Sequence, residues 1–281
     1  MQPQRTANDY KSDLKPVWCP GCGDFGVLKG VYEAMLNLQL DPDKVAIVSG
    51  IGCSGRLPYF TKCYSFHSVH GRSLPTAMGI KLANPELTVL AAGGDGDGFA
   101  IGGGHIPHVA RKNIDITYIV MDNEIYGLTK GQVAPTSPLS QSYSTAPFGN
   151  LESGIDPVAL VLSYGATYVA RGFSGDPGML AELIQKGIEH KGFSFIHVLS
   201  PCPTFNKVVT FKSIRAKTQA VHGHDPTDLR KALDLALDSN AIHLGVFYQM
   251  EKKSYNDRWQ EVWDQASQKP GNLEDLLQRY A

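Results

Sequence analysis

The sequence predicts an α/β fold in which a mostly parallel sheet carries helices on both faces. Short, continuously apolar runs alternate along the chain with stretches whose apolar residues recur at helical spacing. Such alternation favours parallel strands joined by crossover helices, and strands covered on both sides read as unbroken apolar runs. The chain of 281 residues is long enough to form one large domain.

The expected helices carry periodicity or start signals. Apolar residues recur every three or four positions from Phe25 to Leu38, which predicts an amphipathic helix. Asp156 and Asp176 each stand before a proline, as an N-cap stands before the first helical residue. Further helices are expected over 103–112 and near 229–237. The expected strands are 45–48, 87–92, 116–121, 166–170 and 193–199.

Composition excludes several classes of protein. A net charge of −1 offers no basic surface for nucleic acid. No apolar run approaches the roughly 18 residues of a membrane span. The polar segment 1–15 lacks the apolar core of a signal peptide. We therefore expect a cytoplasmic protein that binds neither nucleic acid nor membranes.

The domain organisation is expected to be simple. No repeat or low-complexity segment interrupts the chain, so 1–281 is expected to form a single domain. The part from about 204 to 281 is more polar and holds one clear helical pattern. We interpret it as a C-terminal extension of that domain.

The five cysteines are an odd number in a chain of this length, which argues against a disulfide framework. Cys19 and Cys22 form a Cys-x-x-Cys motif, and three interpretations of it stay open. They are a redox dithiol, a metal or cluster site completed by distant thiolates, and structural thiols. Cys53 and Cys202 follow expected strands, where an open parallel sheet gathers its ligands. Cys63 has no such context and is expected to be structural.

A glycine-rich turn, Gly93–Gly98, follows an expected strand and carries two carboxylates. It contains neither G-x-G-x-x-G nor a P-loop motif. Carboxylates alone repel a phosphate, but Mg²⁺ can join one or two carboxylates to phosphate oxygens. Asn123 follows Asp95 by 28 residues, a separation that fits the end of the next strand. The two loops predict a metal–diphosphate site, although Asp and Asn also start ordinary turns.

The motifs together resemble the β subunit of 2-oxoacid:ferredoxin oxidoreductases. Gly94-Asp95-Gly96 followed by Asn123 is similar to the thiamine diphosphate motif. The match is dense over the first half of the chain, reaches about residue 205 through Cys202, and is loose beyond it. The matching segments are Trp18–Asp24, Gly50–Ser54, His70–Pro75, Gly79–Pro85, Gly93–Gly98, Asp122–Asn123 and Ile125–Gln132.

The resemblance implies a thiamine-diphosphate-binding fold with thiamine diphosphate, Mg²⁺ and a 4Fe-4S cluster. Magnesium is expected on Asp95, Asn123 and the backbone carbonyl of Ile125. The cluster is expected on Cys19, Cys22, Cys53 and Cys202, which makes about 1–24 an N-terminal segment that supplies cluster ligands. The expected cofactor-binding residues are Ile51, Gly52, Cys53, Ser54, His70, Gly94, Asp95, Gly96, Asn123, Ile125, Gly127 and Leu128.

The resemblance also implies a reaction. Thiamine supplies the carbanion chemistry that releases CO₂ from a 2-oxoacid, and the protein supplies binding and electrostatics. The cluster accepts electrons one at a time and passes them to ferredoxin, while coenzyme A takes the acyl group. The glutamate that activates thiamine in this family belongs to the α subunit. We therefore expect one half of a site, completed by an α subunit in a heterodimer or a dimer of heterodimers.

The substrate is inferred from local patterns. The Gly127–Gln132 and Ile51–Arg56 segments look most like family members that use 2-oxoglutarate, with pyruvate or a range of 2-oxoacids as the alternative. Arg56 and Lys130 are candidate contacts to a substrate carboxylate. A nonoxidative thiamine lyase with structural zinc and a non-catalytic electron carrier are the competing functions.

Overall fold

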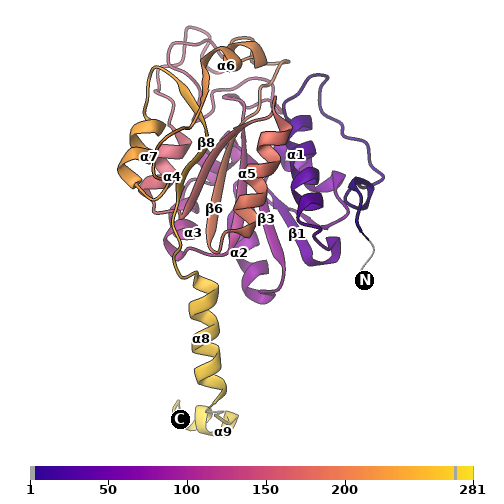
Figure 1. The fold of residues 1–281 in the computed structure, drawn as a ribbon, viewed down its shortest axis with the longest axis vertical. Coiled ribbons are helices and arrows are strands. Elements are labelled where there is room, and N and C mark those ends of the chain that lie inside the picture. The colour runs from indigo at the N-terminus through magenta and orange to yellow at the C-terminus, as the bar shows by residue number, and fades with distance from the viewer. Residues whose placement is uncertain (1–3, 269–270, 281) are drawn as a thin grey trace.

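One eight-stranded sheet forms the centre of the protein (Figure 1). The structure is a computed structural model, and it describes residues 4–268 and 271–280. The strand order is β2-β1-β3-β4-β6-β5-β8-β7. The first six strands in this order, from β2 at the edge to β5, are parallel to one another. Strand β8 pairs antiparallel with β5 and parallel with β7. The strands are β1 (Val45–Ser49), β2 (Tyr64–His67), β3 (Thr88–Gly94), β4 (Ile116–Asp122), β5 (Tyr168–Phe173), β6 (Phe193–Leu199), β7 (Thr218–Ala220) and β8 (Ile242–Gln249).

Helices cover both faces of this sheet, which confirms the predicted fold class. Helices α1 and α5 pack on one face, and α2, α3, α4 and α7 pack on the other. The helices are α1 (Asp24–Asn37), α2 (Ser73–Ala83), α3 (Ile106–Lys112), α4 (Pro157–Ser163), α5 (Pro177–Glu189), α6 (Phe211–Lys217), α7 (Leu229–Ala236), α8 (Tyr255–Ser267) and α9 (Leu273–Gln278).

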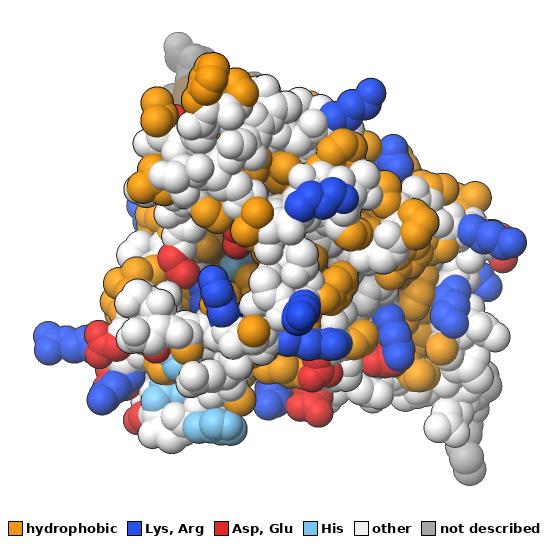
Figure 2. Space-filling model, turned by 90° about the horizontal axis from the view of Figure 1, so that it is seen from above, with side chains coloured by type: hydrophobic (Ala, Val, Ile, Leu, Met, Phe, Trp, Pro, Cys, Tyr) orange, Lys and Arg blue, Asp and Glu red, His pale blue; other side chains and the backbone are white. Residues whose placement is uncertain are grey.

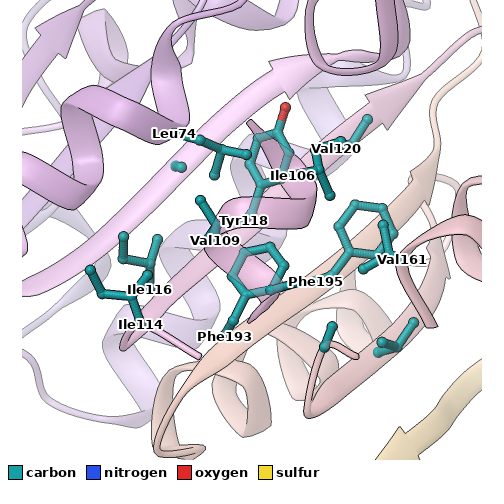
Figure 3. Packing of buried hydrophobic residues seen from close by; sticks show 14 of the residues in the cluster. Leu74, Ile106, Val109, Ile114, Ile116, Tyr118, Val120, Val161, Phe193 and Phe195 are labelled. Carbon is teal, nitrogen blue, oxygen red and sulfur yellow. The ribbon is translucent and has the colours of Figure 1, made fainter. Parts of the chain in front are cut away.

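Alternate strand residues fill the two cores. On β4, Tyr118 and Val120 point into the α2–α3–α4 side, where they meet Phe195 of β6 (Figure 3). Ile119 and Met121 belong to the α1–α5 side. Every residue of β4 is buried, as expected of a central parallel strand with helices on both faces.

Local signals placed most of the predicted elements. The strand 193–199 is confirmed without change, and the Asp156 and Asp176 carboxylates accept hydrogen bonds from Ala159 N and Met179 N as N-caps. The strand predicted at 166–170 lies instead at Tyr168–Phe173, because Gly165, at φ +82°, and the residue after it close helix α4. The helix predicted over 103–112 begins only at Ile106, after a glycine-rich turn.

The C-terminal part contains more structure than its sequence indicates. Strands β7 and β8 extend the sheet, and helix α8 projects away from the body of the molecule (Figure 1). No helix within 4–268 or 271–280 is long and apolar enough to cross a bilayer. The single domain over 1–281, with its N-terminal cluster-ligand segment and its C-terminal extension, stays a prediction.

The parallel strands bring five loops to one edge of the sheet. Strands β2, β1, β3, β4 and β6 are consecutive neighbours, so their carboxyl ends lie together. The chain passes from β1 to β2 on one side and then crosses to β3 on the other. Such a reversal opens a crevice at the carboxyl ends, which is where open α/β sheets bind ligands.

Candidate cofactor site

A cavity of about 440 Å³ lies at this edge. The loops that follow β1, β2, β3 and β4 form its walls. Figure 2 views the molecule from above, and Lys and Arg side chains stand among hydrophobic ones over much of that face. The lining residues are Ile51, Gly52, Cys53, Ser54, His70, Gly94, Asp95, Gly96, Asp97, Asn123, Ile125, Tyr126, Gly127, Leu128, Thr129 and Gln132.

All the residues that the sequence nominated for cofactor binding line this one cavity. The fold thus brings these residues together, whereas their role in binding a cofactor stays a proposal. Four lining residues were not nominated: Asp97, Tyr126, Thr129 and Gln132. Asp97 stands in the glycine-rich turn and the other three in the Ile125–Gln132 segment, so both motifs contained them without indicating a role.

Asp97 ties three strand-end loops together. Its Oδ1 accepts hydrogen bonds from Ile51 N at 2.8 Å and Gly71 N at 2.7 Å, and it lies 2.8 Å from His70 Nδ1. The side chain is almost fully buried, whereas His70 is partly exposed. One carboxylate oxygen therefore fixes the loops after β1 and β2 against the loop after β3.

The glycine-rich turn is packed tightly against the neighbouring loop. The Tyr126 hydroxyl donates to Gly96 O at 3.0 Å. A Cβ atom at Gly96 would lie 2.3 Å from Cε1 of the Tyr126 ring, and one at Gly94 would lie 2.9 Å from Ser54 Oγ. Residues Gly96–Ile101 form a turn of π-helix, a form often found at functional sites. Glycine at these positions leaves the cavity open where backbone can approach a ligand.

The predicted magnesium ligands offer the hard oxygen donors that Mg²⁺ prefers. Asp95 is 2% exposed, and burial raises the pKa of its carboxyl well above the usual range, with the neighbouring Asp122 adding to the rise. In the described part of the chain Asp95 forms no ion pair. Asn123 Oδ1 accepts from Ile125 N at 3.1 Å, which fixes these two residues together. A bound divalent cation would give the buried Asp95 carboxylate a positively charged partner.

The four candidate cluster cysteines lie on three loops that are tied to one another. Cys22 N donates to Cys19 O at 3.0 Å, which closes the Cys-x-x-Cys turn. Gly23 N donates to Pro201 O at 3.1 Å, and Trp18 Nε1 donates to Cys53 O at 2.7 Å. These two bonds join the Cys-x-x-Cys loop to the loops of Cys202 and Cys53.

The thiols also affect one another electrostatically. Burial raises the pKa of the Cys53 thiol to about 11, Asp24 and Cys202 add to the rise, and Arg56 opposes it. Burial likewise raises the pKa of Cys22, with contributions from Asp24 and Cys202. Within the described ranges, no group of three or more His, Cys, Asp or Glu side chains is arranged as a metal site. The cluster therefore stays a proposal.

Two of these thiols adjoin the cavity. Cys53 lines it, and Cys202 Sγ lies 3.4 Å from the position of a Cβ atom on Gly127, another lining residue. Cys63 lies elsewhere, buried with its Sγ 3.7 Å from Met35 Sδ, in keeping with the expected structural role.

Arg56 and Lys130, the candidate substrate contacts, do not line the cavity. Arg56 lies on the short helical segment Ser54–Phe60 directly after Cys53, and its charge is felt at that thiol. Lys130 is exposed in the turn that Lys130 N closes onto Gly127 O. Both flank lining residues, so a substrate role requires a ligand that extends beyond the cavity wall.

Comparisons with known proteins identify the kind of domain that carries this cavity. Residues 42–198 match the family model of the thiamine pyrophosphate enzyme C-terminal TPP-binding domain, and residues 202–264 match that of the C-terminal part of the pyruvate ferredoxin oxidoreductase beta subunit. The chain is 41% identical over 268 residues to 2-oxoacid:ferredoxin oxidoreductase 2, subunit beta, of Aeropyrum pernix, covering 90% of this chain and 87% of that protein.

Two further similar proteins, one a sequence relative and one a solved structure, carry names that specify 2-oxoglutarate. The chain is 50% identical over 192 residues to the 2-oxoglutarate synthase subunit KorB of Methanothermobacter marburgensis, covering 68% of this chain and 67% of the relative. The structure superposes with a TM-score of 0.95 on a 2-oxoglutarate:ferredoxin oxidoreductase from Magnetococcus marinus with 2-oxoglutarate, coenzyme A and succinyl-CoA bound. That match has 44% identity and covers 99% of this chain and 96% of the other. The chain therefore belongs to the family of 2-oxoacid:ferredoxin oxidoreductase beta subunits.

Proposed function

We propose that the chain is the β subunit of a 2-oxoglutarate:ferredoxin oxidoreductase. The enzyme decarboxylates 2-oxoglutarate, transfers the acyl group to coenzyme A as succinyl-CoA, and passes the electrons to ferredoxin; the reverse carboxylation is the same chemistry run backwards. The likeness of almost the whole chain to a structure with 2-oxoglutarate, coenzyme A and succinyl-CoA bound carries this proposal. Pyruvate or a range of 2-oxoacids is the alternative substrate class. The expected cytoplasmic location stays a prediction.

The cavity fits thiamine diphosphate with Mg²⁺. Asp95, Asn123 and the Ile125 carbonyl would hold the metal, and the glycine-rich turn would lie against the diphosphate. When bound, thiamine diphosphate supplies carbanion chemistry at the carbon of the 2-oxo group. The chain contributes rigidity: Asp97 holds three wall loops in place, and Tyr126 buttresses Gly96.

The cysteines beside the cavity fit an electron acceptor. Thiolates are the usual ligands of Fe–S clusters, and Cys19, Cys22, Cys53 and Cys202 stand on loops that are bonded together. Since Cys53 itself lines the cavity, a cluster on these residues would lie close to the reacting cofactor. A cluster held there would supply a redox group beside the cavity.

The cavity is half of a site in this proposal. Among the described residues that line it there is no glutamate. The carboxylate that activates thiamine would come from the α subunit, as the resemblance implies. The chain would therefore bind ferredoxin, coenzyme A and substrate only as part of an assembled enzyme.

Replacing Arg56 with alanine tests the substrate assignment. If Arg56 pairs with the distal carboxylate of 2-oxoglutarate, kcat/KM on 2-oxoglutarate should fall roughly 10- to 100-fold, the usual worth of a charge-assisted hydrogen bond. The rate on pyruvate, which lacks that carboxylate, should change little. The assembled α–β enzyme is assayed on both substrates, with Lys130→Ala as a comparison. An unchanged ratio of the two rates removes Arg56 from the proposal, and a preference of the unaltered enzyme for pyruvate removes 2-oxoglutarate.

A further inference from the structure

Two buried carboxylates meet at one hydroxyl beneath the cavity. Thr136 Oγ1 lies 2.8 Å from Asp95 Oδ2 and 2.9 Å from Asp122 Oδ1. Asp95 is 2% exposed, Asp122 5% and Thr136 8%, so these direct contacts are shielded from bulk water. Asp95 lines the cavity, whereas Thr136 does not. No motif in the sequence had assigned Thr136 a role.

Asp122 is in turn held by a series of buried side chains. Its Oδ2 lies 2.8 Å from His197 Nε2, and Arg171 Nε donates to His197 Nδ1 at 3.0 Å. Arginine has donors only, so His197 Nδ1 must accept and Nε2 must carry the hydrogen that goes to Asp122. Arg171 is anchored by an ion pair to Asp156, the N-cap of α4. Hydrogen-bond donation in this series therefore runs in one direction, from Arg171 to His197 and from His197 to Asp122.

The loop that carries Thr136 is fixed just as firmly. The Ser137 hydroxyl donates to Glu124 O at 2.8 Å, next to the two loop residues proposed as metal ligands. Asn150 Nδ2 donates to Ser137 O at 3.2 Å. These bonds hold the backbone beside Thr136 in place, so Thr136 would not move together with the Asp95 side chain.

A hydroxyl carries one hydrogen, so Thr136 can donate to only one of the two carboxylates at a time. With both carboxylates ionised, the other contact places oxygen lone pairs against each other. Asp122 already accepts Glu124 N and His197 Nε2, and is less in need of a third donor. The hydrogen of Thr136 is thus available for Asp95, whose Oδ2 it would hold while leaving Oδ1 for a ligand.

We propose that Thr136 is the positioning residue for Asp95, and that Asp122, His197 and Arg171 keep Thr136 and Asp95 in register. The proposal rests on the proposed function, in which Asp95 binds the Mg²⁺ of thiamine diphosphate. Groups that orient a metal ligand usually contribute about 10- to 100-fold to metal affinity. Thr136 is expected to act on metal binding rather than on the chemical step.

Thr136→Val keeps the shape of the side chain and removes the hydroxyl, whereas Thr136→Ser keeps the hydroxyl. The assembled enzyme is stripped of metal with a chelator and given saturating thiamine diphosphate over a Mg²⁺ series. Cofactor retained after gel filtration is measured by thiochrome fluorescence. Thr136→Val should need about 10- to 100-fold more Mg²⁺ for half-maximal retention. Thr136→Ser should stay within about threefold of the unaltered enzyme, and kcat at saturating Mg²⁺ should be nearly unchanged in both.

Thr117→Val is the matched control. Thr117 is 4% exposed, and its hydroxyl is also hydrogen-bonded, but to a backbone carbonyl, Gly187 O, at 3.0 Å. It lies near the start of β4, whereas Asp122 ends that strand. It should lower stability without changing the Mg²⁺ requirement. If Thr136→Val does not fold, Thr136→Ala, which is smaller, gives the same readout. A normal Mg²⁺ requirement in the valine or alanine variant, or an equal defect in the serine variant, would overturn the inference alone. An unaltered enzyme that retains no thiamine diphosphate at any Mg²⁺ concentration would overturn the proposed function and the inference together.

Discussion

Gly96→Ala is expected to abolish cofactor retention. Its Cβ atom would lie 2.3 Å from the Tyr126 ring, well inside the closest approach of two carbon atoms. The ring cannot swing away freely, because its hydroxyl donates to Gly96 O and the ring packs against His70. Relief of the clash must therefore displace the glycine-rich turn or the loop after β4, both of which line the cavity.

The measurement is the thiamine diphosphate content of the purified assembled enzyme, together with its melting temperature. We expect retention to fall more than about 100-fold, because misplaced backbone loses several ligand contacts at once. Gly104→Ala is the control, since no heavy atom lies within 4 Å of a Cβ atom at that position. It should bind cofactor normally. Normal thiamine content in Gly96→Ala would mean that the cofactor does not lie against this turn.

Cys202→Ala is expected to uncouple electron transfer from cofactor binding. Cys202 is 8% exposed and packs with Ile125, so the substitution removes one sulfur atom from the neighbourhood of Cys22 and Cys53. A cluster that loses one of four thiolates should be lost or greatly destabilised. Ferredoxin reduction should fall by more than about 100-fold, a larger effect than that of groups that only orient a ligand. Thiamine diphosphate should remain bound.

The control for this substitution is Cys63→Ala. Cys63 is 7% exposed and lies against Met35, so the volume change and the burial are matched. Iron and acid-labile sulfide should stay normal in this variant and fall in Cys202→Ala. Equal iron contents in the two variants would exclude Cys202 as a cluster ligand.

The sequence was sufficient for the parts of the site that depend on short segments. The turn around Asp95 and the loop around Asn123 each follow a buried apolar strand, so their positions at one edge followed from the parallel sheet. The cysteine loops after β1 and β6 were placed by the same reasoning. Strand β8 could not be predicted in this way, because polar residues and a glycine interrupt its apolar residues. It is only partly buried, and it pairs antiparallel with β5 across a bulge.

The supporting contacts could not be predicted in this way. Thr136 lies 41 residues from Asp95, and His197 lies 75 residues from Asp122, with no motif that joins them. The contact between His197 and Asp122 depends on the register between β4 and β6. The contact between Thr136 and Asp95 depends on how the loop after β4 folds back over the end of β3. The sequence shows Asp97 only as a charge in the turn, whereas the fold shows that its carboxylate is hydrogen-bonded to the loops after β1 and β2.

Anaerobic spectroscopy of the assembled α–β enzyme tests the central claim, that thiamine diphosphate and an Fe–S cluster adjoin each other on this chain. We predict bound thiamine, iron and acid-labile sulfide, and bleaching of the cluster's visible absorption when 2-oxoglutarate and coenzyme A are added. We also predict succinyl-CoA as product, and no turnover of a 2-oxoacid with a dye acceptor by the isolated chain. Zinc in place of iron, thiamine without bleaching, a cluster without thiamine, or turnover by the chain alone would contradict this claim.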